Sequence, residues 1–98
     1  MKIYCFDIDG TICTNTNGDY ENAKPYSKRI EQINTLYENN NKIIFLTARG
    51  STTKIDWEEV TKKQLNSWGV QYHELHLTKP HADFYIDDKS KDIFEWFN

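Results

Sequence analysis

The sequence predicts one α/β domain built around a small, mainly parallel sheet. Its 98 residues, 38% of them hydrophobic and 14% aromatic, can enclose one hydrophobic core and leave no room for a second. Runs of β-prone residues alternate along the chain with segments whose apolar residues recur at helical spacing, as in α/β folds. The run at 42–47 is continuously apolar, which is typical of a central strand covered on both faces of a parallel sheet. We therefore expect a single domain over residues 1–98.

The first part of the chain is expected to form a strand, a loop and a helix. A β-prone run predicts a strand over 2–8. Residues 14–24 are rich in Asn, Thr, Gly and Asp, which favours an exposed loop. Pro25 is then expected to open a helix. Its apolar face is marked by residues at spacings of four, three and four, namely Tyr26, Ile30, Ile33 and Tyr37. The Asn run at 39–41 is expected to end the helix, because Asn tolerates the left-handed cap conformation.

The part that follows the central strand is expected to contain two more helices. Residues 48–54 are polar with a glycine, which indicates a loop. A helix is expected from about 56 to 68, because acidic residues in its first turn complement the helix dipole and Gly69 stands at the position of a C-terminal cap. The last residues, 90–97, have the pattern of a short amphipathic helix.

Two further strands are expected between these helices. Residues 72–77 alternate weakly between polar and apolar, and 83–87 form a β-prone run that ends in acids and is expected to be buried. Only residues 78–82 separate the two, whereas a parallel crossover normally takes a dozen or more residues. Either 72–77 is a peripheral edge strand, or it is not a strand.

Composition and charge narrow the classes of partner and compartment. The net charge is −3 and no basic run stands out, which argues on electrostatic grounds against nucleic acid as a partner. No apolar segment approaches the length of a membrane span. Cys5 is expected to be buried in the first strand and Cys13 to be accessible after the next turn, without a disulfide between them. The absence of a signal-peptide pattern leads us to expect a cytoplasmic protein.

Polar residues follow four of the expected strands, at or near their carboxyl ends: Asp7 and Asp9, Thr47, Lys79, and Asp87 with Asp88. Each of them alone has an ordinary structural explanation, such as a solvated turn or a helix cap. Ligands of open parallel sheets bind beyond the carboxyl ends of the strands, so the joint placement predicts a site. Gly10 and Thr11 are expected to leave backbone N–H groups free beside the first two aspartates, which suits a phosphate and a divalent cation.

These residue types suit phosphoryl transfer. A carboxylate can attack phosphorus and form an aspartyl-phosphate, which divides one difficult displacement into two easier ones. A second carboxylate can protonate the leaving oxygen and then accept a proton from the attacking water. Mg²⁺ prefers hard oxygen ligands, and a hydroxyl and an ammonium group would stabilise charge on the transferring group.

Four stretches resemble, in type, order and strand context, the ordered motifs of the haloacid dehalogenase (HAD) superfamily: Asp7-Ile8-Asp9-Gly10-Thr11, Thr47, Lys79 and Asp87-Asp88. The resemblance spans nearly the whole chain. It implies a three-layer α/β/α, Rossmann-like core in which Asp7 is the nucleophile and Asp9 the general acid/base. The same resemblance implies that phosphate is bound by Gly10, Thr47, Ala48 and Lys79. It also implies Mg²⁺ as cofactor, held by Asp7, the backbone carbonyl of Asp9 and Asp87, with Asp88 in or next to the metal shell.

The chain resembles the smallest HAD proteins, which have no cap domain. An open site suits a bulky substrate, or would be closed by another subunit in a homo-oligomer. The family usually has a helix before the last motif strand, and this chain departs from that pattern. The stretches 45–49 and 79–88 are similar to those of small HAD proteins of capsule and surface-polysaccharide biosynthesis, which implies a phosphorylated sugar or polyol-like metabolite as substrate. Arg49 either meets an anionic group of that substrate or is a solvated loop residue.

We therefore expect a Mg²⁺-dependent phosphatase that acts on a small phosphorylated metabolite, without nucleic-acid or membrane partners. If the protein is an enzyme of another kind, the alternative is a phosphotransferase, or a phosphatase that acts on proteins or nucleotides. A catalytically idle HAD-like domain that binds a phosphorylated ligand is the alternative from another class. The presence of both Asp7 and Asp9 argues against an idle domain, because a binding protein has no need of the acid/base.

Overall fold

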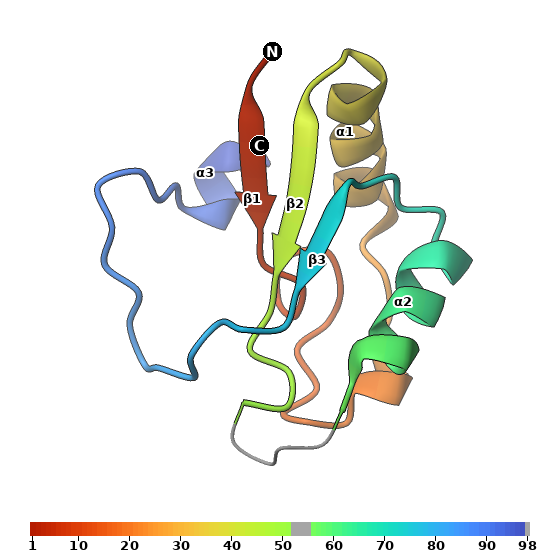
Figure 1. Cartoon of the computed structure of the whole chain (residues 1–98), viewed down its shortest axis with the longest axis vertical. Helices are drawn as coiled ribbons and strands as arrows, with labels where there is room; N and C mark the ends of the chain where they lie inside the picture. Colours follow the sequence, from red (N-terminus) through yellow and green to blue (C-terminus); the bar gives the residue numbers. More distant parts are fainter. Residues whose placement is uncertain (52–55, 98) are drawn as a thin grey trace.

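The centre of the fold is a three-stranded parallel sheet in the order β1-β2-β3 (Figure 1). The structure, a computed structural model, describes residues 1–51 and 56–97. The strands are β1 (Ile3–Phe6), β2 (Lys42–Leu46) and β3 (Glu74–His76). The helices are α1 (Ser27–Glu38), α2 (Glu58–Ser67) and the single-turn α3 (Ile93–Trp96), with a short 3-10 turn, η1 (Tyr20–Asn22), ahead of α1. None of the helices in the described ranges combines the length and the apolar character that a membrane span requires.

The register of the sheet places its large apolar side chains on one face. Tyr4 pairs with Ile43 and Phe6 with Phe45, and residues paired in register project to the same side. The Trp96 ring of α3 packs edge-to-face against both Tyr4 and Phe6, while α1 contributes its own buried isoleucines to this side. The helices that cover the strands therefore lie on one face of the sheet.

The opposite face is largely uncovered in the described residues. Ile3 is 62% exposed, Cys5 is exposed, and β2 alternates between buried and half-buried residues. The expectation of a strand covered on both faces, and with it a three-layer arrangement, is therefore not met within this part of the chain. The physical reason is that the connection from β3 to α3, residues 77–92, contains no helix that could cover this face.

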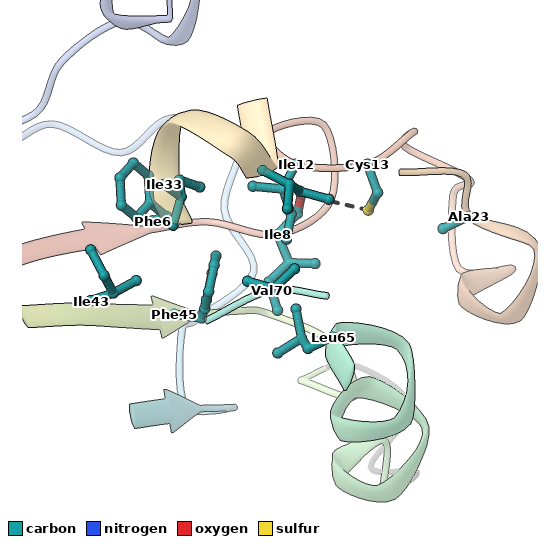
Figure 2. Close-up of a cluster of buried hydrophobic side chains, with 11 residues drawn as sticks. Phe6, Ile8, Ile12, Cys13, Ala23, Ile33, Ile43, Phe45, Leu65 and Val70 are labelled. Atoms are coloured by element: carbon teal, nitrogen blue, oxygen red, sulfur yellow. Dashed lines mark hydrogen bonds between the residues drawn. The ribbon is translucent and has the colours of Figure 1, made fainter. Parts of the chain in front are cut away.

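The core continues beyond the sheet into the turn that follows β1. Ile8, Ile12 and Cys13 are fully buried and pack in one cluster with Phe45 and with α2 (Figure 2). Burial of one such aliphatic or aromatic side chain contributes roughly 1.5–3 kcal/mol. The prediction of a buried Cys5 and an accessible Cys13 is wrong on both counts, because Cys5 lies on the uncovered face and Cys13 lies under the turn.

Most of the expected elements are present with shorter bounds. The first helix begins at Ser27, two residues after Pro25, and the weak strand at 72–77 is confirmed as the edge strand β3. The expected loop at 48–54 lies partly outside the described residues.

The expected strand at 83–87 does not form. All of 81–92 is exposed, and Figure 1 shows this stretch, which we name the arm, projecting away from β1 in blue. Phe84 and Ile86 are 83% and 96% exposed, so the expected burial is also wrong. The residues are β-prone, but a strand needs a neighbour to pair with, and the few residues between β3 and the arm do not bring this segment to one.

Removal of a core side chain tests the one-sided packing. We expect Phe45→Ala to lower the free energy of unfolding by about 3–5 kcal/mol, because Phe45 is fully buried between Phe6 and Tyr72. Ile44→Ala, one position along β2 but on the uncovered face, should cost clearly less. Urea unfolding of the two variants measures both values, and equal losses would show that the second face is covered as well.

Candidate functional site

The turn after β1 positions the two aspartates. Ile8 is fully buried, and its carbonyl accepts hydrogen bonds from the N–H groups of Thr11 and Ile12, both at 3.0 Å. The Gly10 N–H donates to the carbonyl of Cys13 at 2.9 Å, and Gly10 has φ +82°, a conformation that favours glycine. These bonds fix the loop, but they also occupy the N–H groups of Gly10 and Thr11. The prediction that these two amides are free for a ligand is therefore wrong.

Arg29 of α1 supports the same turn, and sequence reasoning missed it. Its Nη1 donates to the carbonyl of Thr11 at 2.9 Å, and its guanidinium lies 5.2 Å from the centre of the Phe97 ring. Arg29 thus connects the turn with α1 and the C-terminal residues. A signal was present in the sequence, because a cation in the first turn of a helix opposes the helix dipole and calls for another partner.

Asp9 is held by Arg49 through two hydrogen bonds. Arg49 Nε donates to Asp9 Oδ2 and Nη2 donates to Asp9 Oδ1, each at 2.9 Å. The remaining Nη1 donates to Thr61 Oγ1 at 3.0 Å and to Gln64 Oε1 at 2.6 Å, both on α2. The Tyr20 ring lies 4.6 Å from the guanidinium carbon. Arg49 is only 2% exposed, which contradicts the alternative of a solvated loop arginine, and the anion that it contacts is Asp9.

Lys79 reaches the first aspartate. Its backbone N–H donates to the carbonyl of Thr47 at 3.2 Å, which fixes this residue at the carboxyl end of β2. From there its Nζ lies 3.8 Å from Asp7 Oδ1 and 4.0 Å from the centre of the Tyr85 ring. The predicted proximity of Lys79 to Asp7 is therefore present in the structure.

A cavity of about 580 Å³ joins these groups. Among its lining residues are Asp7, Asp9, Thr47, Ala48, Arg49 and Lys79. Thr47 is 1% exposed, and its Oγ1 accepts a hydrogen bond from the Arg49 backbone N–H at 3.2 Å. Gly10 lies outside this lining and faces a neighbouring hollow along β1. The structure thus brings together the expected residues from three successive strand ends.

Burial is the largest cause of the raised pKa of two groups in the turn after β1, Asp7 and Cys13. It raises the pKa of Asp7, and the Lys79 ammonium and the Ile8 backbone amide oppose this shift without cancelling it. Burial, with the charge of Asp9 as the next cause, raises the pKa of Cys13 to about 12. The thiol is therefore neutral near pH 7, which argues against Cys13 as a nucleophile.

Asp87 and Asp88 lie apart from this cavity. Both are exposed residues of the arm, and a hydrogen bond from the Lys89 backbone N–H lowers the pKa of Asp87. Residues 1–51 and 56–97 contain no group of three or more His, Cys, Asp or Glu side chains placed to hold a metal. With Asp9 already held by Arg49, one chain as it stands does not provide the set of carboxylates expected for Mg²⁺.

No family model matches the sequence, and no curated protein matches it. Among solved structures, the chain resembles the crystal structure of a target protein from Vibrio cholerae, with a TM-score of 0.89 and 29% sequence identity. The similarity covers 99% of this chain and 88% of the other. Together with the three parallel strands and their helices, it supports an α/β fold.

Loss of Arg49 should destabilise the protein through the charge that it leaves behind. We expect Arg49→Met to lower the free energy of unfolding by roughly 3–5 kcal/mol, because the Asp9 carboxylate, 15% exposed, would lose its partner. The double variant Arg49→Met with Asp9→Asn should recover part of this loss. Urea unfolding of the single and double variants measures the coupling, and strictly additive losses would show that the pair is not coupled.

Neutralising Asp7 should stabilise the protein in a pH-dependent way. Because the folded-state pKa of Asp7 is raised, the native state binds protons more tightly than the unfolded state, and stability falls as the pH rises between the two pKa values. Asp7→Asn removes this cost, so its melting temperature should exceed that of the wild type near about pH 7 and approach it near about pH 3. A variant that is less stable at neutral pH would show that the Lys79 ion pair outweighs burial.

Proposed function

We propose that this protein is a Mg²⁺-dependent phosphatase of the HAD type without a cap domain, which hydrolyses a phosphomonoester through an aspartyl-phosphate intermediate. One observation carries the proposal: Asp7, Asp9, Thr47 and Lys79 line one cavity although they come from different strand ends. Enzymes lower the barrier to phosphoryl transfer mainly by positioning the nucleophile and stabilising charge on the phosphoryl group. A carboxylate nucleophile beside a cation and a hydroxyl meets both requirements.

In the proposed reaction an ionised oxygen of Asp7 forms a bond to phosphorus while the ester bond between phosphorus and the alcohol oxygen breaks. The departing alcohol oxygen takes a proton from Asp9. A water molecule then attacks the phosphorus of the aspartyl-phosphate and gives its proton to Asp9, and the bond between phosphorus and Asp7 breaks. The products are the alcohol and inorganic phosphate, and Asp7 is regenerated as a carboxylate.

The raised pKa of Asp7 supports this assignment, because a more basic carboxylate is a better nucleophile once it is ionised. Lys79, 3.8 Å away, would offset the negative charge of an incoming phosphate. Thr47 and Ala48 lie on the cavity wall where the phosphate oxygens would be expected. We assign Arg49 a positioning role: its two bonds to Asp9 fix the direction in which that carboxylate faces the cavity.

In this proposal, Mg²⁺ is the cofactor, and it would neutralise negative charge on the phosphate. Of the two aspartates that line the cavity, Asp7 is the one that Arg49 does not hold, and the backbone carbonyl of Asp9 is a second oxygen in the same turn. Since these do not make up the expected ligand set, the steps above are written for the residues of the chain and none is routed through the ion. The proposed substrate is a phosphorylated sugar or polyol-like metabolite, and the proposed compartment is the cytoplasm.

One observation favours a second candidate, a domain that binds a phosphorylated ligand without turning it over. Both oxygens of Asp9 accept hydrogen bonds from Arg49, so the acid/base must give up part of this pairing before it can exchange a proton with substrate. An enzyme of this design needs the pairing to loosen when phosphate enters, whereas a binding domain does not.

Phosphate release decides between the two. We expect the purified protein to hydrolyse p-nitrophenyl phosphate with Mg²⁺, to stop in the presence of EDTA, and to lose at least about a thousandfold in rate on Asp7→Asn. Glu38→Gln, which exchanges an exposed carboxylate at the end of α1 for an amide, should leave the rate unchanged. A panel of sugar, polyol, amino-acid and nucleotide phosphates then identifies the substrate class.

Hydrolysis that survives Asp7→Asn would exclude the covalent mechanism. No release from any member of the panel by folded protein in Mg²⁺ would favour the binding domain.

A further inference from the structure

The edge of β1 that faces away from β2 is open within the described residues, where β1 pairs with β2 alone. A hollow of about 570 Å³ runs along this edge. Its lining includes the apolar Ile3, Phe6, Ile93 and Trp96. An open strand edge presents unpaired backbone N–H and C=O groups, which is a ready site for another strand.

The arm carries a segment that fits this edge. Residues 83–87 alternate between polar and apolar side chains, and Phe84 and Ile86 are almost fully exposed. Lys79 lines the carboxyl end of this edge together with Asp7 and Asp9, so Asp87 would meet a cation there. The apolar residues of the segment match the apolar lining of the hollow.

The segment cannot run parallel to β1 of its own chain. Its start would have to lie about 13 Å back along the sheet and about 14 Å across three strand spacings from Lys79, a distance of about 19 Å. Lys79 is fixed by its backbone bond to Thr47, and the four peptide units from Lys79 to Asp83 reach at most about 14 Å. Within one chain Asp87 is therefore kept away from Asp7.

We propose that two copies of this chain exchange their arms, each adding residues 83–87 as a parallel strand to the open edge of β1 of the other copy. A second copy removes the limit on chain length, because the segment then approaches the edge from outside. The exchange is reciprocal, so a twofold dimer uses both open edges and both arms.

One register satisfies two separate requirements. With Asp87 level with Asp7, Phe84 and Ile86 stand level with Tyr4 and Phe6, and thus on the face that α3 covers. Tyr85 then stands level with Cys5 on the uncovered face. The carboxylates alone set this register, yet it also brings the exposed apolar residues of the arm onto the packed side of the sheet.

The exchange would complete the site. It places Asp87 of one copy beside Asp7 of the other, which supplies the carboxylate that a single chain lacks for Mg²⁺. This part of the inference rests on the proposed function, whereas the pairing of the arm with β1 does not.

Cross-linking tests the pairing without any activity. The variant Cys5→Ser with Tyr85→Cys, mixed with wild-type chain, can join its new thiol to the wild-type Cys5 only between two chains. After mild oxidation we expect a disulfide-linked heterodimer on a non-reducing gel, with Cys13 unreactive because it is buried. Cys5→Ser with Asn39→Cys, an exposed site at the end of α1, controls for random collisions. Folded chains that give no more heterodimer than this control, or that elute at the mass of one chain, overturn the exchange.

Complementation tests the shared site. Asp7→Asn and Asp87→Asn should each be inactive alone, whereas a mixture equilibrated long enough to exchange subunits should regain about a quarter of the wild-type activity, since half of the dimers are mixed and each holds one intact site. A mixture that stays inactive while cross-linking succeeds shows that Asp87 does not serve the partner's site. A wild type without phosphatase activity refutes the proposed function and leaves the cross-linking result to decide the exchange.

Discussion

The paired charges of Asp9 and Arg49 are the interaction on which the rest of the site depends. A guanidinium that is 2% exposed is tolerated only when its donors are satisfied, and here every donor group has a partner. Asp9 comes from the turn after β1, Arg49 from the loop after β2, and Thr61 and Gln64 from α2. One buried cation thus connects three elements that are distant in the sequence, and it fixes α2 against the carboxyl end of the sheet.

The same end of the sheet is ordered by backbone hydrogen bonds. The carbonyl of Thr47 accepts the N–H of Lys79, and the N–H of Thr47 donates to the carbonyl of His76, so the chain after β3 continues along β2 before it leaves the sheet. This path brings the Lys79 ammonium to Asp7, which burial has made more basic. The position of the Lys79 ammonium and the raised pKa of Asp7 therefore depend on the path of the chain as well as on the residue types.

The connection between β3 and α3 contains no helix and adds no strand to the sheet. In the part of the chain that the structure describes, one face of the sheet and one edge of β1 therefore lack cover, and Ile3 and Cys5 are exposed. Exposed strand edges promote association, and proteins usually protect them with charges, bulges or covering segments. Here the apolar residues of the arm, 81–92, are exposed at the same time. A second copy of the chain would remove both liabilities together.

The sequence by itself determined the α/β class, the strands β1 and β2, the helices α1 and α2, and the convergence of Asp7, Asp9, Thr47 and Lys79. The helices and strands follow from hydrophobic periodicity, which is a property of a few neighbouring residues. The convergence of the site residues follows from the rule that parallel strands bring their carboxyl ends to one edge of the sheet, where ligands bind.

Only the tertiary structure decided which face of the sheet is covered, and hence that Cys5 is exposed and Cys13 is buried. It also decided that Arg49 and Arg29 hold the turn after β1, since their partners come from other parts of the chain. The segment 83–87 has the pattern of a strand, yet whether it pairs depends on chain length and on a neighbouring edge. Pattern is a local property of the sequence, whereas pairing is a property of the assembled fold.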